Sequence, residues 1–262
     1  MSDCAGDNSK PRVVVLGGCG FIGRNLVEYL IANDLVSGLR VVDKTPPQLA
    51  FLNSTHSKIF EDSRIEYKSA NLINPTSCAS ALDPGDGAPW GLVVNCAGET
   101  RVGQTEAVYS EGLFTLSTNV ARQCAKLKVN RLVEISSGQM HSSDKPQKED
   151  CPVEPWTTEA KMKSKVEKEL KGMADELNYT IIRPAIVYGV GDRRSLNRHS
   201  LCSRRSERQA PHRVGRYMSQ VLPRAHSAGA VCWGRAAAQQ AAVSGRQQDE
   251  SRHAARRTPA HH

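Results

Sequence analysis

The stretch Arg12-Val-Val-Val-Leu-Gly-Gly-Cys-Gly-Phe-Ile-Gly23 decides the fold of this chain. A β-branched run leads directly into glycines spaced Gly17-x-x-Gly20-x-x-Gly23, and the amphipathic run Asn25-Leu-Val-Glu-Tyr-Leu-Ile31 follows. This order predicts a strand, a glycine turn and a helix. Gly17 permits a sharp turn, Gly20 lets the backbone approach a ligand, and Gly23 lets the helix pack close to the strand. The N–H groups and the dipole at the helix start favour an anion such as a pyrophosphate.

An acidic residue at the end of the next predicted strand supports a dinucleotide site. The run Leu39-Arg-Val-Val-Asp43 ends in a carboxylate 20 residues after Gly23, where it would accept hydrogen bonds from the ribose of an adenosine. A carboxylate also repels a 2′-phosphate, so we expect NAD rather than NADP. Lys44 is the counter-argument, because a cation could bind that phosphate. The alternative interpretation is a tight strand–helix turn with no ligand.

Length and composition exclude several classes of protein. The chain has 262 residues, enough for one large domain or two small ones. It has no run of about 18 apolar residues, so we expect no membrane span. The polar N-terminus lacks the apolar core of a signal peptide, and the eight cysteines form no CxxC pair. Cys19, Cys96 and Cys124 resemble small buried hydrophobes. We therefore expect a cytoplasmic protein without a metal site.

The net charge of +8 is unevenly distributed. Residues 1–192 carry 21 Lys and Arg against 24 Asp and Glu, a net charge of −3. Residues 193–262 carry 14 Arg, no Lys and three acids, a net charge of +11. The basic character therefore belongs to the last 70 residues, which contain neither Ile nor Phe and show no periodic apolar pattern.

Three interpretations of residues 193–262 are compatible with that composition. A basic arm could bind nucleic acid or an acidic partner, but the segment lacks interleaved aromatic residues. A solvated tail is the second, because the segment has too little apolar surface to offset the entropy of ordering. The third is a segment translated out of frame, for which richness in Arg, Ala, Ser, Gln and His is typical. We favour the third, and we expect neither chemistry nor nucleic-acid binding from this tail.

Strands and helices alternate up to Asp192, which predicts an α/β fold. The expected strands are 12–16, 39–43, 64–68, 91–95, 131–136 and 179–183, and the expected helices are 21–34, 75–82, 107–128 and 158–177. This alternation favours a Rossmann-type, doubly wound parallel sheet, with the ligand beyond the carboxyl ends of the strands. The expected organisation is a polar arm over residues 1–10, an NAD(P)-binding domain over 11–192 and the irregular tail over 193–262.

Four motifs, in this order, resemble the extended short-chain dehydrogenase/reductases. They are Gly17-Gly-Cys-Gly-Phe-Ile-Gly23, Asn95-Cys-Ala-Gly98, Glu134-Ile-Ser-Ser137 and Arg183-Pro-Ala-Ile-Val-Tyr-Gly-Val-Gly-Asp192. More narrowly, the chain resembles the NAD-dependent epimerase/dehydratase and 3β-hydroxysteroid-dehydrogenase-like branch over about residues 11–193. The resemblance implies a Rossmann-type fold and a nicotinamide cofactor, and it is much less specific for the substrate.

The resemblance also implies a set of site residues. Those implied for cofactor binding are Gly17, Gly20, Phe21, Ile22, Gly23, Asp43, Asn95, Ala97, Gly98, Lys165, Pro184 and Val187. The implied catalytic residues are Ser137, which would hydrogen-bond a substrate oxygen, Asn119 on a helix, and Lys165, which would hold the nicotinamide ribose. For Ser137 the alternative is a turn serine bonded to the backbone.

The main departure from the family is on the helix that carries Lys165. The family pairs this Lys with a Tyr four residues before it, and the ammonium lowers the phenol pKa. Here that position is Lys161, and a shift of one residue offers only Met162. No Lys of the chain has a Tyr four residues before it. Lys161 could replace the Tyr only with a strongly lowered pKa. The alternative, which we prefer, is that Lys161, Lys163 and Lys168 are ordinary solvated charges.

A second departure is that the arginine-rich tail stands where the family places its substrate lobe. We expect hydride transfer at a secondary alcohol or carbonyl carbon of a small molecule, such as a sugar nucleotide or a sterol, by a chain that lacks the usual Tyr. The competing hypothesis is a non-catalytic dinucleotide-binding protein, either a sensor or an assembly factor. A homodimer is left open, and neither the substrate nor the direction of a reaction follows from the sequence.

Overall fold

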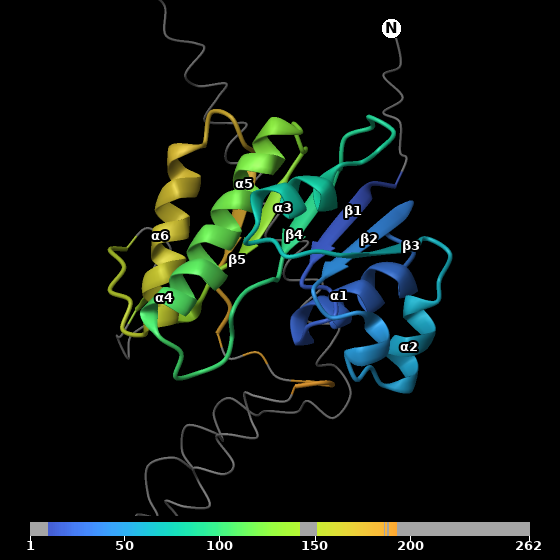
Figure 1. Ribbon diagram of the computed structural model, residues 1–262, viewed down its shortest axis with the longest axis horizontal. Helices are drawn as coiled ribbons and strands as arrows, with labels where there is room; N and C mark the ends of the chain where they lie inside the picture. The colour runs from blue at the N-terminus through green and yellow to red at the C-terminus, as the bar shows by residue number, and fades with distance from the viewer. Residues whose placement is uncertain (1–9, 142–150, 186, 188, 193–262) are drawn as a thin grey trace, which may run out of the picture. The chain divides into compact units, whose positions relative to one another are not determined.

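The computed structural model describes residues 10–141, 151–185, 187 and 189–192, and six strands within them form one sheet (Figure 1). The strands are β1 (Arg12–Leu16), β2 (Gly38–Asp43), β3 (Ile65–Ser69), β4 (Leu92–Asn95), β5 (Leu132–Ile135) and β6 (Tyr179–Ile182). Their order across the sheet is β3-β2-β1-β4-β5-β6, and every neighbouring pair is parallel. This order, which reverses direction between β1 and β4, confirms the Rossmann-type doubly wound sheet.

Helices cover both faces of the sheet. The α-helices are α1 (Phe21–Ala32), α2 (Ser54–Phe60), α3 (Pro75–Leu82), α4 (Glu106–Tyr109), α5 (Leu116–Lys126) and α6 (Thr158–Gly172). The 3₁₀ turns η1 (Pro47–Leu49) and η3 (Gly138–Met140) and the π-helix η2 (Ser110–Thr115) are shorter. Apolar side chains of α1 and α2 pack on one face, and those of α3, α5 and α6 pack on the other (Figure 1).

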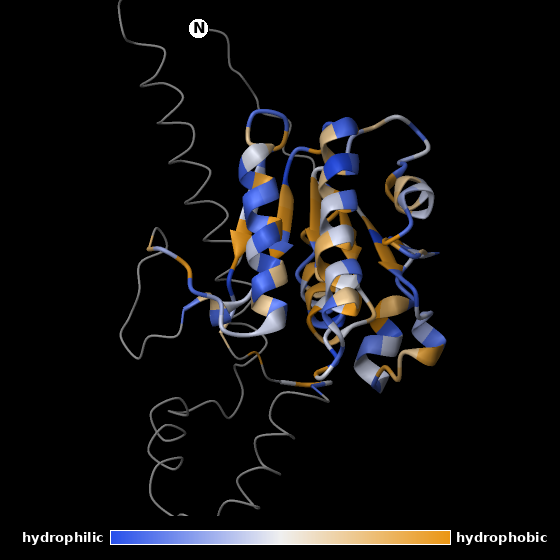
Figure 2. Cartoon of the chain, turned by 60° about the vertical axis from the view of Figure 1, so that its left-hand side comes forward, coloured by the Kyte–Doolittle hydropathy of each residue, from blue (hydrophilic) through white to orange (hydrophobic). Residues whose placement is uncertain are grey.

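Alternation along β1 builds the two halves of the core. Val13 and Val15 point into the layer with α1, whereas Val14 and Leu16 point into the layer with α3, α5 and α6. Successive residues of a strand face opposite sides, and a parallel strand covered on both faces is apolar throughout. These four side chains are at most 1% exposed. Figure 2 shows the apolar strands between helices with polar outer faces. The glycine turn therefore follows directly on a strand that is buried on both faces.

The predicted strands and helices agree with the structure except in two places. All six predicted strands are present, each within one residue of its expected bounds. The expected helix 158–177 ends at Gly172, and the expected helix 107–128 is interrupted by η2. A Cβ on Gly112, inside η2, would lie 2.8 Å from Cβ of Glu99, and the Gly112 carbonyl accepts a hydrogen bond from the Glu99 N–H at 3.1 Å. The loop after β4 therefore lies close against the helix at Gly112, and the helix has a wider, π-helical turn at this point.

Helix α2 has no counterpart among the predicted elements. Its N-cap is Asn53, whose side chain accepts a hydrogen bond from the His56 N–H at 2.7 Å. Asn is a favoured cap, but seven residues are too few to show an apolar period.

The terminal segments of the predicted organisation fall mostly outside the structure. The expected arm over residues 1–10 and the expected tail over residues 193–262 lie outside the described residues, apart from Lys10. Within the described ranges, no helix is long and apolar enough to cross a membrane.

Candidate functional site

Gly17 and Gly23, the first and last glycines of the motif, give the connection between β1 and α1 its shape. Gly17 has a φ of +71°, and a Cβ on it would lie 2.7 Å from the backbone of Ala97. A Cβ on Gly23 would lie 2.2 Å from the carbonyl oxygen of Gly17, so a larger residue would push α1 off the turn. The Gly17 N–H donates to the Val42 carbonyl at 2.7 Å and attaches the turn to β2. The turn therefore has the shape that the glycine spacing predicts.

Gly20 lies on the outer side of this turn. It is exposed, and a Cβ on it would meet only the carbonyl oxygen of Gly17, at 3.0 Å. Gly20 is also the N-cap of α1, so it offers no capping side chain, and the first turn of α1 contains no acidic residue. Helix N–H groups that no side chain caps attract an anion. Together with Phe21 and Ile22, both partly exposed, this turn fits the pyrophosphate of a dinucleotide.

The carboxylate of Asp43 lies beside the glycine turn. Its Oδ2 accepts a hydrogen bond from the Cys19 N–H at 3.1 Å, and its Oδ1 accepts one from the Thr45 N–H at 3.0 Å. The first bond joins the end of β2 to the turn. Each carboxylate oxygen can accept a further hydrogen bond, so the group is able to bind a ribose hydroxyl as well. Lys44, the competing cation, is exposed.

Burial favours the protonated form of the cysteines near the turn. Burial, with Asp43 nearby, raises the pKa of the Cys19 thiol to about 12, and burial raises the pKa of Cys96 to about 12. Such thiols stay protonated near neutral pH and are poor nucleophiles and metal ligands. Cys19 and Cys124 are buried and Cys96 is partly exposed. Among the described residues, no three His, Cys, Asp or Glu side chains are grouped to hold a metal ion.

Asn95 ends β4 and is completely buried. Its Oδ1 accepts a hydrogen bond from the Ala97 N–H at 3.1 Å, which shapes the turn after the strand. Its Nδ2 donates to Ser117 Oγ at 3.1 Å and to Glu134 Oε2 at 2.7 Å. The Asn95 side chain is therefore a support beneath the site. Ala97 and Gly98, which are partly exposed, are the residues of this turn that can line it.

Asn119 ties α5 to the segment after β3. Its Nδ2 donates to the carbonyl of Ile73 at 2.8 Å and to that of Leu72 at 3.3 Å. These bonds hold a loop at the carboxyl edge of the sheet, so Asn119 has a positioning role here. A catalytic role for Asn119 stays a prediction.

The segment after β5 pairs with the segment after β6. The Gly138 N–H donates to the Pro184 carbonyl at 2.7 Å, so Ser137 and Pro184 lie in neighbouring segments. Ser137 Oγ accepts a hydrogen bond from the Gln139 N–H at 3.1 Å and caps η3. This is the bond expected of a turn serine. Because the oxygen only accepts in this bond, the hydroxyl hydrogen of Ser137 is still able to donate to a substrate. Val187, partly exposed, follows in the same segment as Pro184.

Helix α6 turns Lys163, and not Lys165, towards the sheet. Lys161 and Lys165 are exposed. The Nζ of Lys163 donates to Glu134 Oε1 at 3.1 Å and to the Ile135 carbonyl at 2.6 Å, and the Lys163 side chain is only 12% exposed. The expectation that Lys163 is an ordinary solvated charge is therefore wrong. The role of Lys165 at a nicotinamide ribose stays a prediction.

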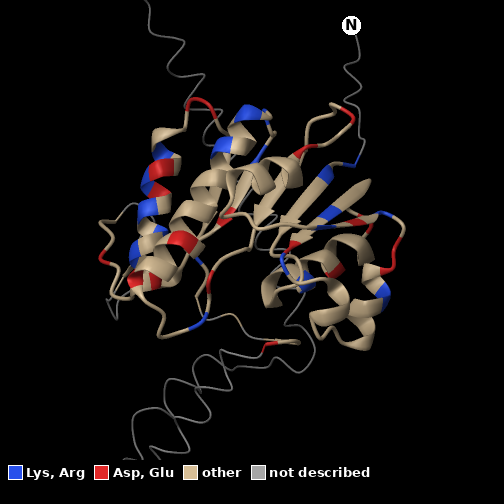
Figure 3. Cartoon of the chain, in the orientation of Figure 1, with Lys and Arg blue, Asp and Glu red and all other residues tan. Residues whose placement is uncertain are grey.

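The helical period explains the orientation of Lys163. Ala160, Lys163, Glu167 and Leu170 follow one another at three or four residues and share one face of α6. Ala160, Glu167 and Leu170 are at most 3% exposed, so this face is turned to the sheet. Figure 3 shows the positive and negative charges that alternate along the helix. The spacing was a usable signal, but charged neighbours on every side of the helix obscure it.

Tyr109 packs α4 against α6. Its hydroxyl lies 3.0 Å from Glu159 Oε1 and 2.7 Å from the Arg101 carbonyl, and Met162 is buried in the same cluster. Tyr109 is 2% exposed, and burial raises its pKa. A raised phenol pKa opposes proton transfer near neutral pH. Tyr109 therefore does not replace the Tyr that the family carries on the equivalent of α6.

Glu167 joins α6 to the segments that follow β5 and β6. Its Oε1 accepts hydrogen bonds from Ser136 Oγ at 2.6 Å and from Arg183 Nε at 3.0 Å, and its Oε2 accepts one from Arg183 Nη2 at 2.6 Å. Burial alone would raise the pKa of Glu167, but the hydrogen bonds from Arg183 and Ser136 hold it below its ordinary value. Ser136 and Arg183 belong to the quoted motifs, whereas their partner Glu167 is absent from the predicted site.

Exposed apolar side chains follow the carboxyl ends of the strands. Among the described residues, six large hydrophobic side chains are exposed. Five of them are Leu49 and Phe51 after β2, Val102 after β4, Trp156 after β5 and Val190 after β6. Ligands of open α/β sheets bind at this edge, and exposed apolar groups are common at binding surfaces. The predicted site and the exposed apolar residues therefore share one edge of the sheet.

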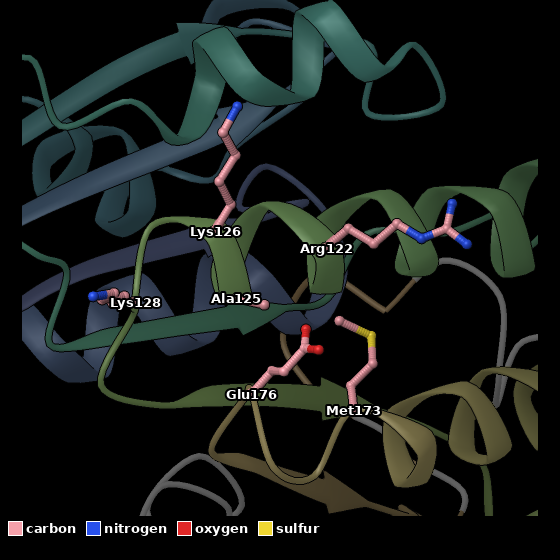
Figure 4. A pocket seen from close by; sticks show the side chains of 6 residues that line it. All are labelled: Arg122, Ala125, Lys126, Lys128, Met173 and Glu176. Carbon is pink, nitrogen blue, oxygen red and sulfur yellow. The ribbon is translucent and has the colours of Figure 1, made fainter.

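A hollow of about 430 Å³ lies away from this edge. It is lined by Arg122, Ala125, Lys126, Lys128, Met173 and Glu176. These residues shortly precede β5 and β6, so the hollow lies towards the amino ends of the strands. Figure 4 shows the three cationic side chains directed away from one another. They do not converge on one point, and the hollow has no part in the predicted site.

Solved structures of sugar-nucleotide epimerases share this fold. A UDP-galactose 4-epimerase is 21% identical, with a TM-score of 0.59 over 76% of this chain and 63% of that one. A UDP-glucuronic acid 4-epimerase from Bacillus cereus, in complex with NAD, is 19% identical, with a TM-score of 0.58 over 68% and 57% of the two chains. A UDP-glucose 4-epimerase from Thermus thermophilus, also in complex with NAD, is 24% identical, with a TM-score of 0.57 over 68% and 56%. The chain thus spans 56% to 63% of the length of these three structures.

Sequence comparison identifies the family. No curated protein matches the chain. The profile of the NAD dependent epimerase/dehydratase family matches residues 13–231, a range that contains the glycine turn, nearly the whole sheet and the quoted motifs. Because this match covers most of the sequence, the chain belongs to the NAD-dependent epimerase/dehydratase family.

Proposed function

We propose that the chain binds NAD at the glycine turn and catalyses hydride transfer at a secondary alcohol or carbonyl carbon. One observation carries this proposal: Gly17, Gly23, the uncapped start of α1 and Asp43 meet at one point of the sheet edge. Strand order reverses there, between β1 and β4, and open parallel sheets bind their ligands at such a point. Family membership and the NAD bound in the Bacillus cereus and Thermus thermophilus structures support the proposal.

Different residues at the turn would bind different parts of the cofactor. Gly20 and the first N–H groups of α1 would meet the pyrophosphate, and Asp43 would accept hydrogen bonds from the adenosine ribose. A 2′-phosphate would be repelled by the Asp43 carboxylate, so we infer NAD rather than NADP. When bound, NAD supplies a hydride acceptor to the site. Ser137 would orient a substrate oxygen through its hydroxyl hydrogen.

Two lysines of α6 are candidates for the ammonium beside the nicotinamide. Lys165 matches the family motif but is exposed. The Nζ of Lys163 lies beside the carboxyl end of β5, where Glu134 and Ile135 accept two hydrogen bonds from it. An ammonium has three N–H donors, so Lys163 has one more to offer at this edge. The two lysines can be separated by substitution, because one is buried in a network and the other is not.

A non-catalytic dinucleotide-binding protein is the second candidate function. The observation in its favour is that α6 has no Tyr at position 161, where the family carries one, or at position 162. Lys161 is exposed and Met162 is 1% exposed, so neither position offers a phenol. Tyr109, which packs against α6, has a raised pKa and is buried. Cofactor binding without hydride transfer is the behaviour that this hypothesis requires.

Cofactor binding is tested first, on the full chain. Isothermal titration calorimetry with NAD and with NADP should show saturable binding of NAD and weaker binding of NADP. No heat of binding for either dinucleotide would reject both candidate functions. Light scattering on the same sample tests the homodimer, which, like the cytoplasmic location, stays a prediction.

Hydride transfer then separates the two candidates. The chain is incubated with deuterium-labelled NADH and an oxidised sugar nucleotide, and with NAD and UDP-glucose, UDP-galactose or UDP-glucuronic acid, and the products are followed by NMR. Transfer of deuterium, or a change of configuration at one sugar carbon, supports the enzyme. NAD binding without transfer, in the wild type and in Lys161→Tyr alike, supports the non-catalytic protein. Transfer gained only in Lys161→Tyr would indicate an enzyme that lost its acid/base group.

A further inference from the structure

Arg24, the residue after the third glycine, joins the glycine turn to a second loop. It is 8% exposed, and its guanidinium donates to four backbone carbonyls. Nε donates to Gly20 at 3.2 Å, Nη2 donates to Cys19 at 2.5 Å and to Ala50 at 2.9 Å, and Nη1 donates to Phe51 at 3.3 Å. A guanidinium has five N–H groups in a rigid fork. Four of them are therefore used to hold the backbone.

Both backbone polar groups of Cys19 are hydrogen-bonded to side chains. Its N–H donates to Asp43 Oδ2, and its carbonyl accepts from Arg24 Nη2. Cys19 lies in the part of the turn that follows Gly17 and leads to Gly20, where the backbone of a glycine turn meets a pyrophosphate. Asp43 and Arg24 together fix the orientation of this part of the turn.

The loop that Arg24 holds is the one that follows Asp43. It runs over residues 44–53, and the carbonyls of Ala50 and Phe51 attach it to Arg24. Phe51 has a φ of +53°, a conformation that is costly for a residue with a large side chain, and that side chain is 73% exposed. Such a conformation persists only where the surroundings hold it. The hydrogen bond from Arg24 contributes to that restraint.

The segment after β6 reaches the same end of α1. The carbonyl of Val190 accepts a hydrogen bond from Asn25 Nδ2 at 3.1 Å. A Cβ on Gly191 would lie 3.4 Å from Cδ of Arg24. The glycine turn, the loop 44–53 and the segment after β6 therefore all lie next to the first turn of α1, which carries Arg24.

We propose that Arg24 is a positioning residue for the dinucleotide. It holds the loop 44–53 on the glycine turn and so sets the distance between that turn and Asp43 that the adenosine half of the cofactor requires. The proposal rests on the proposed binding of NAD and deepens it. Arg24 acts through backbone carbonyls and not through contact with the cofactor. The geometry of its fork, and not its charge alone, is what the site needs.

Arg40 supplies a matched control. It is 6% exposed, and its Nη1 donates to the backbone carbonyls of Ala81 and Asp83 at 3.1 and 2.5 Å. Those carbonyls lie at the end of α3, before β4, and thus towards the opposite edge of the sheet. Arg40→Met therefore removes a buried arginine that binds backbone without touching the glycine turn. Arg24→Met removes fork and charge together, and Arg24→Lys keeps the charge but loses the fork.

The test measures the affinity of the full chain for NAD and for ADP-ribose, together with the thermal unfolding of each variant. Titrations are made well below every unfolding temperature. We expect Arg24→Met and Arg24→Lys to raise both dissociation constants at least about tenfold, while Arg40→Met loses stability and keeps both constants within about twofold of the wild type. Where Arg24→Met does not fold, Arg24→Lys decides.

Four results are distinguishable from the expected one: three overturn the positioning role, and the fourth rejects the proposed function. Arg24→Met with wild-type affinity overturns the positioning role while NAD binding stands. Wild-type affinity in Arg24→Lys also overturns it, because charge alone would then be sufficient. A loss of affinity in Arg40→Met equal to that in Arg24→Met reduces the effect to general destabilisation and overturns it too. Absence of NAD binding in the wild type rejects the proposed function itself.

Discussion

Lys163 and Glu134 form a buried ion pair at the carboxyl end of β5, with 3.1 Å between Nζ and Oε1 and side chains that are 12% and 1% exposed. Glu134 also accepts hydrogen bonds from Asn95 at 2.7 Å and from Ser117 at 2.9 Å. A buried carboxylate is tolerated only when it is paired and hydrogen-bonded. One carboxylate therefore joins β4, α5 and α6 directly beneath the predicted site.

Removal of the Lys163 ammonium should destabilise the fold strongly. Lys163→Met leaves the buried Glu134 charge without its partner, and we expect a loss of about 3–5 kcal/mol in the free energy of unfolding. Lys165 is exposed, so Lys165→Met should change the same free energy by less than about 0.5 kcal/mol. Urea unfolding followed by circular dichroism measures both.

The double variant Glu134→Gln with Lys163→Met is the internal control for this pair. A neutral amide does not need the ammonium, so the double variant should be more stable than Lys163→Met alone. Equal stabilities of Lys163→Met and Lys165→Met would contradict the pairing. NAD titration of the same variants shows which of the two lysines the cofactor needs.

A side chain at the third glycine should abolish the cofactor site. In Gly23→Ala the Cβ would lie 2.2 Å from the Gly17 carbonyl oxygen, so α1 must shift away from the turn. We expect NAD binding to fall below detection in calorimetry, with a lower unfolding temperature. The matched control is Gly172→Ala in the last turn of α6, where a Cβ would meet no atom within 4 Å beyond its own stretch of helix. Its helix should gain up to about 1 kcal/mol, with NAD affinity unchanged. Normal NAD binding by Gly23→Ala would sink the proposed site.

The carboxylate of Asp43 should set the preference between the two dinucleotides. Asp43→Asn removes the negative charge that repels a 2′-phosphate but keeps an oxygen able to accept the Cys19 N–H. We expect the ratio of the NADP and NAD dissociation constants to fall at least about tenfold. Asp34→Asn, an exposed change just after the end of α1, serves as the control. An unchanged ratio in Asp43→Asn would place the adenosine ribose elsewhere.

The hydrogen bonds of Glu167 should make the free energy of unfolding depend on pH in the acidic range. Hydrogen bonds from Arg183 and Ser136 outweigh burial and hold the pKa of Glu167 below its ordinary value of 4.5. A carboxyl whose pKa is lowered by folding stabilises the protein above its unfolded pKa, and this contribution is lost as the pH falls through the folded pKa. The wild type should thus exceed Glu167→Gln in stability at about pH 7, and the difference should shrink from about pH 4.5 downwards. Unfolding in urea at several pH values measures it; a constant difference would contradict the pKa shift.

Local pattern was sufficient for the fold and for part of the site. The β-branched run up to Leu16, the spacing of Gly17 and Gly23, and Asp43 at the end of β2 depend on residues close together in the chain. Periods of two and 3.6 residues, with glycine where φ is positive, can be read without any tertiary contact. For this reason the six strands and the glycine turn were predictable. Helix α2 and the π-helical η2 were not, because a short helix has little periodicity and η2 depends on the distant Glu99.

The sequence by itself therefore determined the Rossmann-type order of elements, the glycine turn with Asp43, and the absence of a Tyr four residues before Lys165. Only the tertiary structure decided that Lys163 is the lysine paired with Glu134, that Asn95 is a buried support, and that Arg24 holds the loop 44–53. Each of these depends on a partner from 26 to 39 residues away or on the helix face that the packing selects. A charged side chain carries no sign of its partner in the local sequence, because burial and pairing arise only when distant segments meet.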